Sequence, residues 1–259
     1  MIRTGSEIKS VAFVGSGKVA NGFASLFHQS GFTITGISSR NKETGKALAV
    51  KVEAPFFDSP SELKADLIIV TVSDQHVIEV VNNFSAKQNI AFSAGSIALE
   101  NMNHKKTRAV FYPLQTFTEG RNLKAKEIPI LLEANTKSLQ KKLEAICNEI
   151  GFEYLNCDSE KRKKIHLSAV FLNNFVNHLV YLSQEEALKN KLDWALFQPL
   201  LNETFEKLKF LSPFEAQTGP AKRNDRLIIE NHLSLLEGRN KEIYKLLSQN
   251  IIETYSKND

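Results

Sequence analysis

The first part of the chain alternates short apolar runs with amphipathic stretches. Stretches with apolar residues at helical spacing separate the runs and predict helices over about 18–30, 41–51, 74–84 and 136–150. The apolar runs predict buried strands over residues 8–14, 32–38, 66–72, 90–94, 109–112, 128–133 and 152–155. Strands that alternate with helices are typical of a mostly parallel sheet covered on both faces. We therefore predict an α/β fold for this part of the chain.

The hydrophobic pattern changes after Asp158. Strand signals fade, and apolar residues recur at helical spacing over 159–188, 194–211, 225–237 and 240–255. We therefore predict two domains, an α/β domain over residues 1–158 and an all-helical domain over residues 159–259.

A glycine motif follows the first predicted strand. Gly15, Gly17 and Ala20 form a G-x-G-x-x-A pattern between that strand and a helix. Such a turn lets the backbone approach a pyrophosphate, which the free N–H groups of the helix then bind. We predict a dinucleotide site made by Gly15, Ser16, Gly17, Lys18 and Val19. An ordinary glycine turn is the alternative.

The residues after the second predicted strand indicate which dinucleotide is bound. NAD sites usually place a carboxylate there to bind the ribose 2′-hydroxyl, but here Ser39 and Arg40 follow the strand and the first carboxylate is Glu43. A guanidinium can bind a 2′-phosphate with two hydrogen bonds. We predict that NADP is the cofactor and that Ser39 and Arg40 select it. Arg40 as a plain surface arginine is the alternative.

Two further strand ends carry small or polar residues. Because ligands of open α/β sheets bind beyond the carboxyl ends of the strands, we expect Val72 and Ser73 to contact the cofactor. Asp74 suits the N-cap of the helix that follows. Gly95 would lie near the nicotinamide, although a simple turn is an equal alternative.

Composition narrows the class of protein. The chain has 33 basic and 29 acidic side chains, a net charge of +4 without the clustering of a nucleic-acid binder. The run 161–164 is interpreted as a solvated helix start. No apolar run reaches the ~20 residues of a membrane span. The sequence shows neither a secretory signal nor metal-ligand spacing, so we expect a cytoplasmic protein without a metal.

Several segments resemble known families. The N-terminal pattern resembles the NADP-binding domain of pyrroline-5-carboxylate reductases, F420-dependent NADP reductases and β-hydroxyacid dehydrogenases. Tyr112–Phe117, Lys164–Asn174 and Gln217–Asp225 resemble the Rossmann-like, DUF2520-domain proteins. The resemblance implies a Rossmann domain followed by an all-α domain of the 6-phosphogluconate-dehydrogenase C-terminal type, commonly dimeric. We accordingly expect a homodimer. The resemblance supplies no substrate.

Four polar residues are candidates for the chemistry. Many relatives carry a histidine where this chain has Phe92, and His-Pro where it has Tyr112 followed by proline, so neither histidine can be carried over. His166 and Asn173 fall on one helical face and could polarise a carbonyl or imine, with Tyr112 as a further proton donor. Satisfied buried polar groups are the alternative. Arg223 could clamp a substrate carboxylate or pair with a carboxylate of its own chain or of a dimer mate.

These features predict an NADP-dependent oxidoreductase. Hydride would pass between NADP(H) and a small carbonyl, imine or hydroxyacid, the substrate being anionic. An NADP-binding sensor or scaffold that acts through its helical domain is the second hypothesis, because no clear catalytic lysine–asparagine pair is present. A reductase with a deazaflavin partner is the third.

Overall fold

The computed structural model describes residues 7–103 and 105–256. They form two compact units that divide after Leu172. Helix α5 (Ser159–Ala169), the first element after the boundary expected at residue 158, belongs to the first unit.

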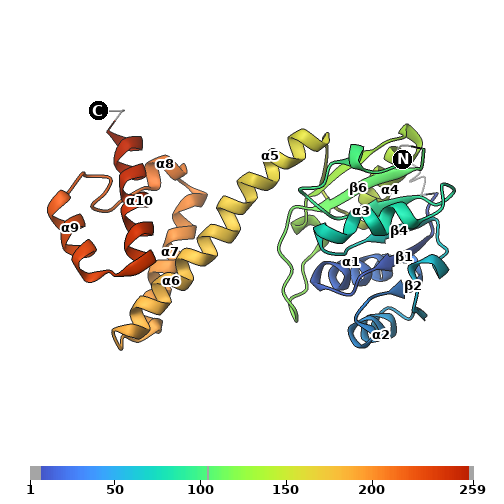
Figure 1. Cartoon of the computed structure of the whole chain (residues 1–259), viewed down its shortest axis with the longest axis horizontal. Coiled ribbons are helices and arrows are strands. Elements are labelled where there is room, and N and C mark those ends of the chain that lie inside the picture. The colour runs from blue at the N-terminus through green and yellow to red at the C-terminus, as the bar shows by residue number, and fades with distance from the viewer. Residues whose placement is uncertain (1–6, 104, 257–259) are drawn as a thin grey trace. The chain divides into compact units, whose positions relative to one another are not determined.

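An eight-stranded sheet forms the centre of the first unit (Figure 1). Its spatial order is β3-β2-β1-β4-β5-β6-β7-β8, and every neighbouring pair is parallel except β6 and β7. The predicted mostly parallel sheet is therefore confirmed. The strands are β1 (Ser10–Val14), β2 (Thr33–Ser38), β3 (Phe56–Phe57), β4 (Leu67–Val70), β5 (Ile90–Phe92), β6 (Arg108–Pro113), β7 (Ile130–Ala134) and β8 (Tyr154–Asn156).

The order of the strands fixes where a ligand would bind. The chain winds outward from β1 through β2 to β3, and then crosses back to place β4 on the other side of β1. In register, Phe13 of β1 lies opposite Ile37 of β2 and Ile69 of β4. The direction of winding reverses between β1 and β4, and α/β proteins bind ligands beyond the carboxyl ends of the strands at such a point.

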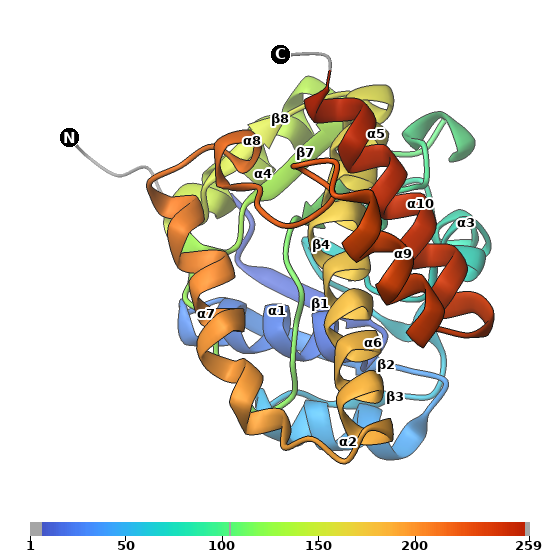
Figure 2. The same cartoon turned by 90° about the vertical axis from the view of Figure 1, so that its left-hand side faces the viewer.

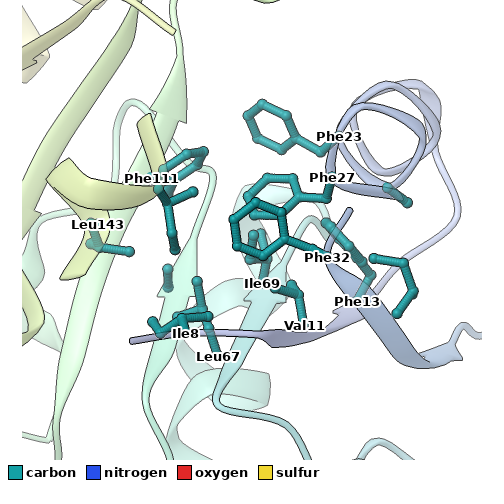
Figure 3. Close-up of a cluster of buried hydrophobic side chains, with 14 of the residues drawn as sticks. Ile8, Val11, Phe13, Phe23, Phe27, Phe32, Leu67, Ile69, Phe111 and Leu143 are labelled. Atoms are coloured by element: carbon teal, nitrogen blue, oxygen red, sulfur yellow. The ribbon is translucent and has the colours of Figure 1, made fainter. Parts of the chain in front are cut away.

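Helices cover both faces of the sheet because successive strand residues point to opposite sides. Helices α1 (Lys18–Gln29), α2 (Lys42–Lys51) and α4 (Lys137–Ile150) pack on one face, and α3 (Asp74–Asn83) packs on the other. On the first face, phenylalanine rings meet edge to face in the core shown in Figure 3, and the labelled ones include Phe23, Phe27, Phe32 and Phe111. This packing holds α1, and with it the glycine turn, against β1.

The second unit is all-helical, as predicted. The division between the units falls within a π-helical segment (Val170–Phe175). The α-helices of the second unit are α6 (Val176–Lys189), α7 (Gln198–Glu206), α8 (Pro213–Ala216), α9 (Arg226–Leu235) and α10 (Gly238–Tyr255). Helices α9 and α10 lie side by side in both views (Figures 1 and 2). Among the described residues, no helix is both long enough and apolar enough to cross a membrane.

Candidate functional site

The glycine turn after β1 has the geometry that a pyrophosphate requires. Gly15 has a φ of +112°, and a Cβ atom there would lie 2.8 Å from the carbonyl oxygen of Thr71. Its N–H donates to the carbonyl of Ser38, 2.8 Å away. Only glycine fits this position. At Gly17, by contrast, a Cβ would meet nothing within 4 Å, so the turn is open on the side that a ligand would approach.

The N-terminus of α1 is prepared for an anion. Gly17 is its N-cap and provides no side-chain cap, and the first turn, which begins with Lys18 and Val19, contains no acidic residue. The Asn21 amide donates to the carbonyl of Ser16, 3.1 Å away, and so fixes the turn. Uncapped N–H groups at the positive end of a helix dipole bind phosphate oxygens. The residues present therefore fit the pyrophosphate of a dinucleotide.

Three hydroxyl groups gather where the β1 and β2 turns meet. Ser16 Oγ lies 2.7 Å from Ser39 Oγ and 2.6 Å from Thr44 Oγ1, so this cluster joins the glycine turn to the start of α2. Sequence reasoning identified Ser16 and Ser39 but missed Thr44. Its position in the first turn of α2, four residues beyond Arg40, was the available signal.

Arg40 lies exposed directly after this cluster. Its Nη1 is 3.1 Å from His76 Nε2, on α3. Within the described ranges, no carboxylate forms an ion pair with Arg40, and the residue that follows it, Asn41, is the uncharged N-cap of α2. Among the described residues, the Arg40 guanidinium at the end of β2 therefore has no carboxylate partner.

The turn after β4 differs from the prediction in one respect. Asp74 is the first residue of α3 rather than its N-cap; Ser73 holds the N-cap position without a side-chain cap hydrogen bond. The Asp74 carboxylate instead accepts a hydrogen bond from the Ser96 hydroxyl. It was wrong to expect a capping role because the carboxylate has a partner in a distant loop. Val72 packs against the core on the α3 side of the sheet.

A tyrosine–histidine pair lies beside Gly95. Tyr112, near the carboxyl end of β6, has its hydroxyl 2.9 Å from His166 Nδ1, on α5, and the rings meet edge to face. A Cβ at Gly95 would lie 2.8 Å from both His166 Nδ1 and Tyr112 Cζ. Glycine thus permits the pair to pack against the backbone after β5. The sequence analysis proposed Tyr112, His166 and Gly95 as site residues but did not predict that they are in contact.

Burial disfavours ionisation of the Tyr112 phenol. Burial and, less strongly, the negative charge of Asp74 raise the pKa of Tyr112, while the cation of Arg162 lowers it by less. The phenol therefore stays protonated at neutral pH. Either the phenol donates to His166 Nδ1, or Nδ1–H donates to the phenol oxygen, and each arrangement leaves one N–H or O–H to donate elsewhere.

A buried ion pair anchors α5 one turn before His166. Arg162 is fully buried and pairs with Glu133 of β7; its Nη2 also donates to the carbonyl of Ile97, 2.6 Å away. Ser159, the first residue of α5, donates its hydroxyl to Glu133 at 2.9 Å. These bonds connect the segment after Gly95 to the helix that carries His166.

The basic run 161–164 is therefore not a uniformly solvated helix start. Arg162 is buried, whereas Lys161, Lys163 and Lys164 are exposed. A helix turns one residue in a basic run inward while its neighbours face solvent, and charge alone does not reveal which one.

The other two predicted catalytic residues belong to the second unit. Asn173 is exposed and lies in the π-helical segment (Val170–Phe175). Arg223 is exposed in the turn before α9, whose N-cap Asp225 accepts from the N–H of Ile228. Their roles toward a substrate stay predictions.

The sheet order, the glycine turn and the uncapped helix start define a Rossmann dinucleotide-binding protein. Comparison with family models agrees. The model described as NADP oxidoreductase, coenzyme F420-dependent, matches residues 10–94, and the model of DUF2520, a domain of unknown function, matches residues 128–251.

Solved structures extend this likeness over nearly the whole chain. A candidate NADP oxidoreductase from Bacteroides fragilis is 35% identical with a TM-score of 0.86, and the alignment covers 95% of this chain and 99% of that one. Two more distant structures share the fold. A Thermotoga maritima protein is 24% identical with a TM-score of 0.67, and the alignment covers 96% of this chain and 99% of that one. The 1-pyrroline-5-carboxylate reductase from Streptococcus pyogenes is 16% identical with a TM-score of 0.59, and the alignment covers 95% of this chain and 97% of that one. None of the curated proteins matches the sequence.

The chain belongs to the same family as the Bacteroides fragilis protein, and it joins a Rossmann domain to a region that matches DUF2520. Family and fold support an oxidoreductase that uses a nicotinamide cofactor and acts on a small molecule. They leave the substrate unspecified.

Proposed function

We propose that this protein is an NADP-dependent oxidoreductase that transfers hydride between NADP(H) and a small carbonyl, imine or hydroxyacid. The observation that carries the proposal is the Tyr112–His166 pair, with its 2.9 Å contact, beside Gly95 at the carboxyl edge of the sheet. The same edge carries the dinucleotide turn. The Tyr112–His166 pair and the glycine turn thus lie at the same edge of the sheet, within the first unit.

The choice of NADP over NAD is supported by the end of β2. Arg40 and the hydroxyl of Ser39 stand where an NAD site has a carboxylate. Charge-assisted hydrogen bonds contribute about 1.5–3 kcal/mol, so replacing Arg40 with alanine should weaken NADPH binding roughly ten- to a hundredfold. NADH binding should change little. Equal losses for both dinucleotides, measured by fluorescence titration, would refute the assignment.

The chain's own residues would manage the proton. A nicotinamide bound at the glycine turn would supply or accept the hydride. The neutral phenol of Tyr112 donates to His166 Nδ1 and orients the ring, so that Nε2–H can donate to the oxygen or nitrogen of the substrate. In the reduction of a carbonyl, His166 would give its Nε2 proton to the substrate oxygen while the phenol proton of Tyr112 passes to Nδ1, so the imidazole stays neutral and the phenolate regains a proton from solvent.

Steady-state kinetics and cofactor binding together distinguish a role of His166 in proton transfer from a role in cofactor binding. Purified protein with NADPH would be tested against a panel of keto acids and cyclic imines. His166→Gln should lower kcat by about 10²–10⁴-fold, the usual contribution of a general acid, while the Kd for NADPH stays within twofold. Tight NADPH binding without turnover of any panel member would favour a sensor or scaffold instead. Unchanged kcat in the variant would remove His166 from the mechanism.

Two residues of the second unit complete the proposal. Asn173 would help polarise the substrate, and Arg223 would bind an anionic tail through its guanidinium fork. The matched variant Arg223→Lys keeps the charge but loses the fork, so KM for carboxylate substrates should rise while that for uncharged analogues stays unchanged. An equal rise for both classes would contradict the role.

The exposed apolar side chains of the second unit support the proposal that the protein is a homodimer. Among its described residues the buried apolar side chains are few and mostly small: Ala187, Ala216, Ala221 and Ile229. Large apolar residues on α6 and α7 are exposed, as Leu188 and Leu200 are. Such surfaces mark association sites, and a second copy of the chain is the proposed occupant. Analytical ultracentrifugation should give a dimer; a monomer at micromolar concentration would contradict this.

A further inference from the structure

Arg40 lies next to a histidine of α3. His76, half-buried on the first turn of α3, reaches Arg40 from the opposite side of the glycine turn, with Nη1 and Nε2 3.1 Å apart. The segments after β2 and β4 flank β1 in the sheet, so their side chains converge over the turn that follows β1.

We propose that His76 is a second binding residue for the 2′-phosphate and makes the preference for NADP(H) depend on pH. This inference rests on the proposed function. The ligand class is a nucleotide that carries a phosphate monoester on its adenosine ribose.

The proton positions explain why His76 suits this role. A guanidinium has only donors, so the contact requires an unprotonated Nε2 on His76. The Gln75 amide also lies near this atom, its Nε2 3.2 Å away. A dianionic phosphate placed between Arg40 and His76 would replace this contact with two charge-assisted ones. Arg40 would donate from one side, and a protonated His76 would donate from the other.

The charged groups around His76 come from two segments. Arg40 approaches from the β2–α2 segment, while Asp74 and Glu79 lie on α3 itself. The Asp74 carboxylate accepts from Ser96. Without a phosphate, Arg40 opposes a second positive charge on His76. With a phosphate between them, two negative charges offset both cations, so binding takes up a proton.

The experiment measures the ratio of the Kd values for NADH and NADPH from pH 6.5 to 8.5, in which a phosphate monoester with a second pKa near 6 stays mostly dianionic. In the wild type this ratio should fall about fivefold or more as pH rises. The reason is that His76 loses its proton, so its charge-assisted hydrogen bond to the 2′-phosphate is replaced by a weaker, neutral one. His76→Gln retains an amide N–H but does not titrate. Its ratio should lie below the wild-type value at pH 6.5 and change less than twofold over the range.

Matched variants and probes keep the outcomes distinct. His178→Gln makes the same substitution at an exposed histidine of α6 and should retain the wild-type pH slope. The fragments 2′,5′-ADP and 5′-AMP should repeat the contrast without any nicotinamide. The same slope in His76→Gln as in the wild type, with NADPH still preferred, would overturn the role of His76 and leave the cofactor proposal intact. Failure of the wild type to bind either dinucleotide would overturn the cofactor proposal itself.

Discussion

Removal of the Arg162 side chain should be among the most damaging single changes in the first unit. Arg162 is fully buried and contacts the Glu133 carboxylate, the carbonyl of Ile97 and, at 3.2 Å, the hydroxyl of Ser159. Arg162→Met keeps much of the apolar volume but leaves Glu133 charged, largely buried and without its cation. Breaking a buried ion pair on one side costs about 3–5 kcal/mol, and we expect a loss in this range.

The partner substitution tests whether the ion pair itself carries this energy. Glu133→Gln retains shape and hydrogen-bonding capacity without the negative charge. The double variant removes both charges, so its destabilisation should be smaller than the sum of the two single losses by about 1–3 kcal/mol. Urea denaturation followed by circular dichroism at 222 nm measures each free energy of unfolding, and the slopes check that the transitions are comparable.

An adjacent lysine provides the control. Lys163 is exposed and forms an i,i+3 ion pair with Glu160. Lys163→Met should change stability by less than about 0.5 kcal/mol because exposed pairs contribute little. Hydrogen exchange should also show that Arg162→Met loosens α5 around His166. If Arg162→Met cost less than about 1 kcal/mol, or if the two single losses were additive, the buried-anchor interpretation would be wrong.

Two further predictions concern the first unit. Gly95→Ala would place a Cβ 2.8 Å from atoms of both Tyr112 and His166, so their hydrogen bond should break at a cost of about 1–3 kcal/mol in stability; nitrogen chemical shifts of the His166 imidazole that match the wild type would contradict this. Backbone N–H groups at the start of β1 lower the pKa of Asp66. Stability from this carboxylate is therefore complete above its unfolded pKa, near 4, and is lost as pH falls through the lower folded value. Asp66→Asn should lose less stability than the wild type between pH 7 and pH 3, and an identical loss in both proteins would refute the role of Asp66.

The sequence predicted most of the first unit because buried parallel strands are continuous apolar runs. The runs at 8–14 and 32–38 correspond to β1 and β2 with shifts of one or two residues. Strand β3 was missed because it has two half-buried residues, too few to form a pattern. The long helix expected over 159–188 contains a π-helical segment of six residues, which is too short to give a periodic signal of its own.

The candidate site was predictable in its parts but not in its contacts. The glycine turn, Arg40, Tyr112 and His166 follow from residue types at strand ends and from family resemblance. The meeting of Tyr112 with His166 depends on how α5 packs on the first unit, which spacing along the chain does not encode. The same holds for the buried Arg162 and for His76 beside Arg40. Long-range contacts between polar side chains required the structure.

Titration of the purified wild-type protein with NADPH and NADH tests the central claim most directly. Protein and cofactor fluorescence would give both Kd values at one pH and ionic strength. The charge-assisted contacts available at the end of β2 predict saturable binding of NADPH at least about tenfold tighter than that of NADH. Folded protein that binds NADH as tightly as NADPH, or that binds neither, would contradict the assignment of this chain as an NADP-dependent oxidoreductase.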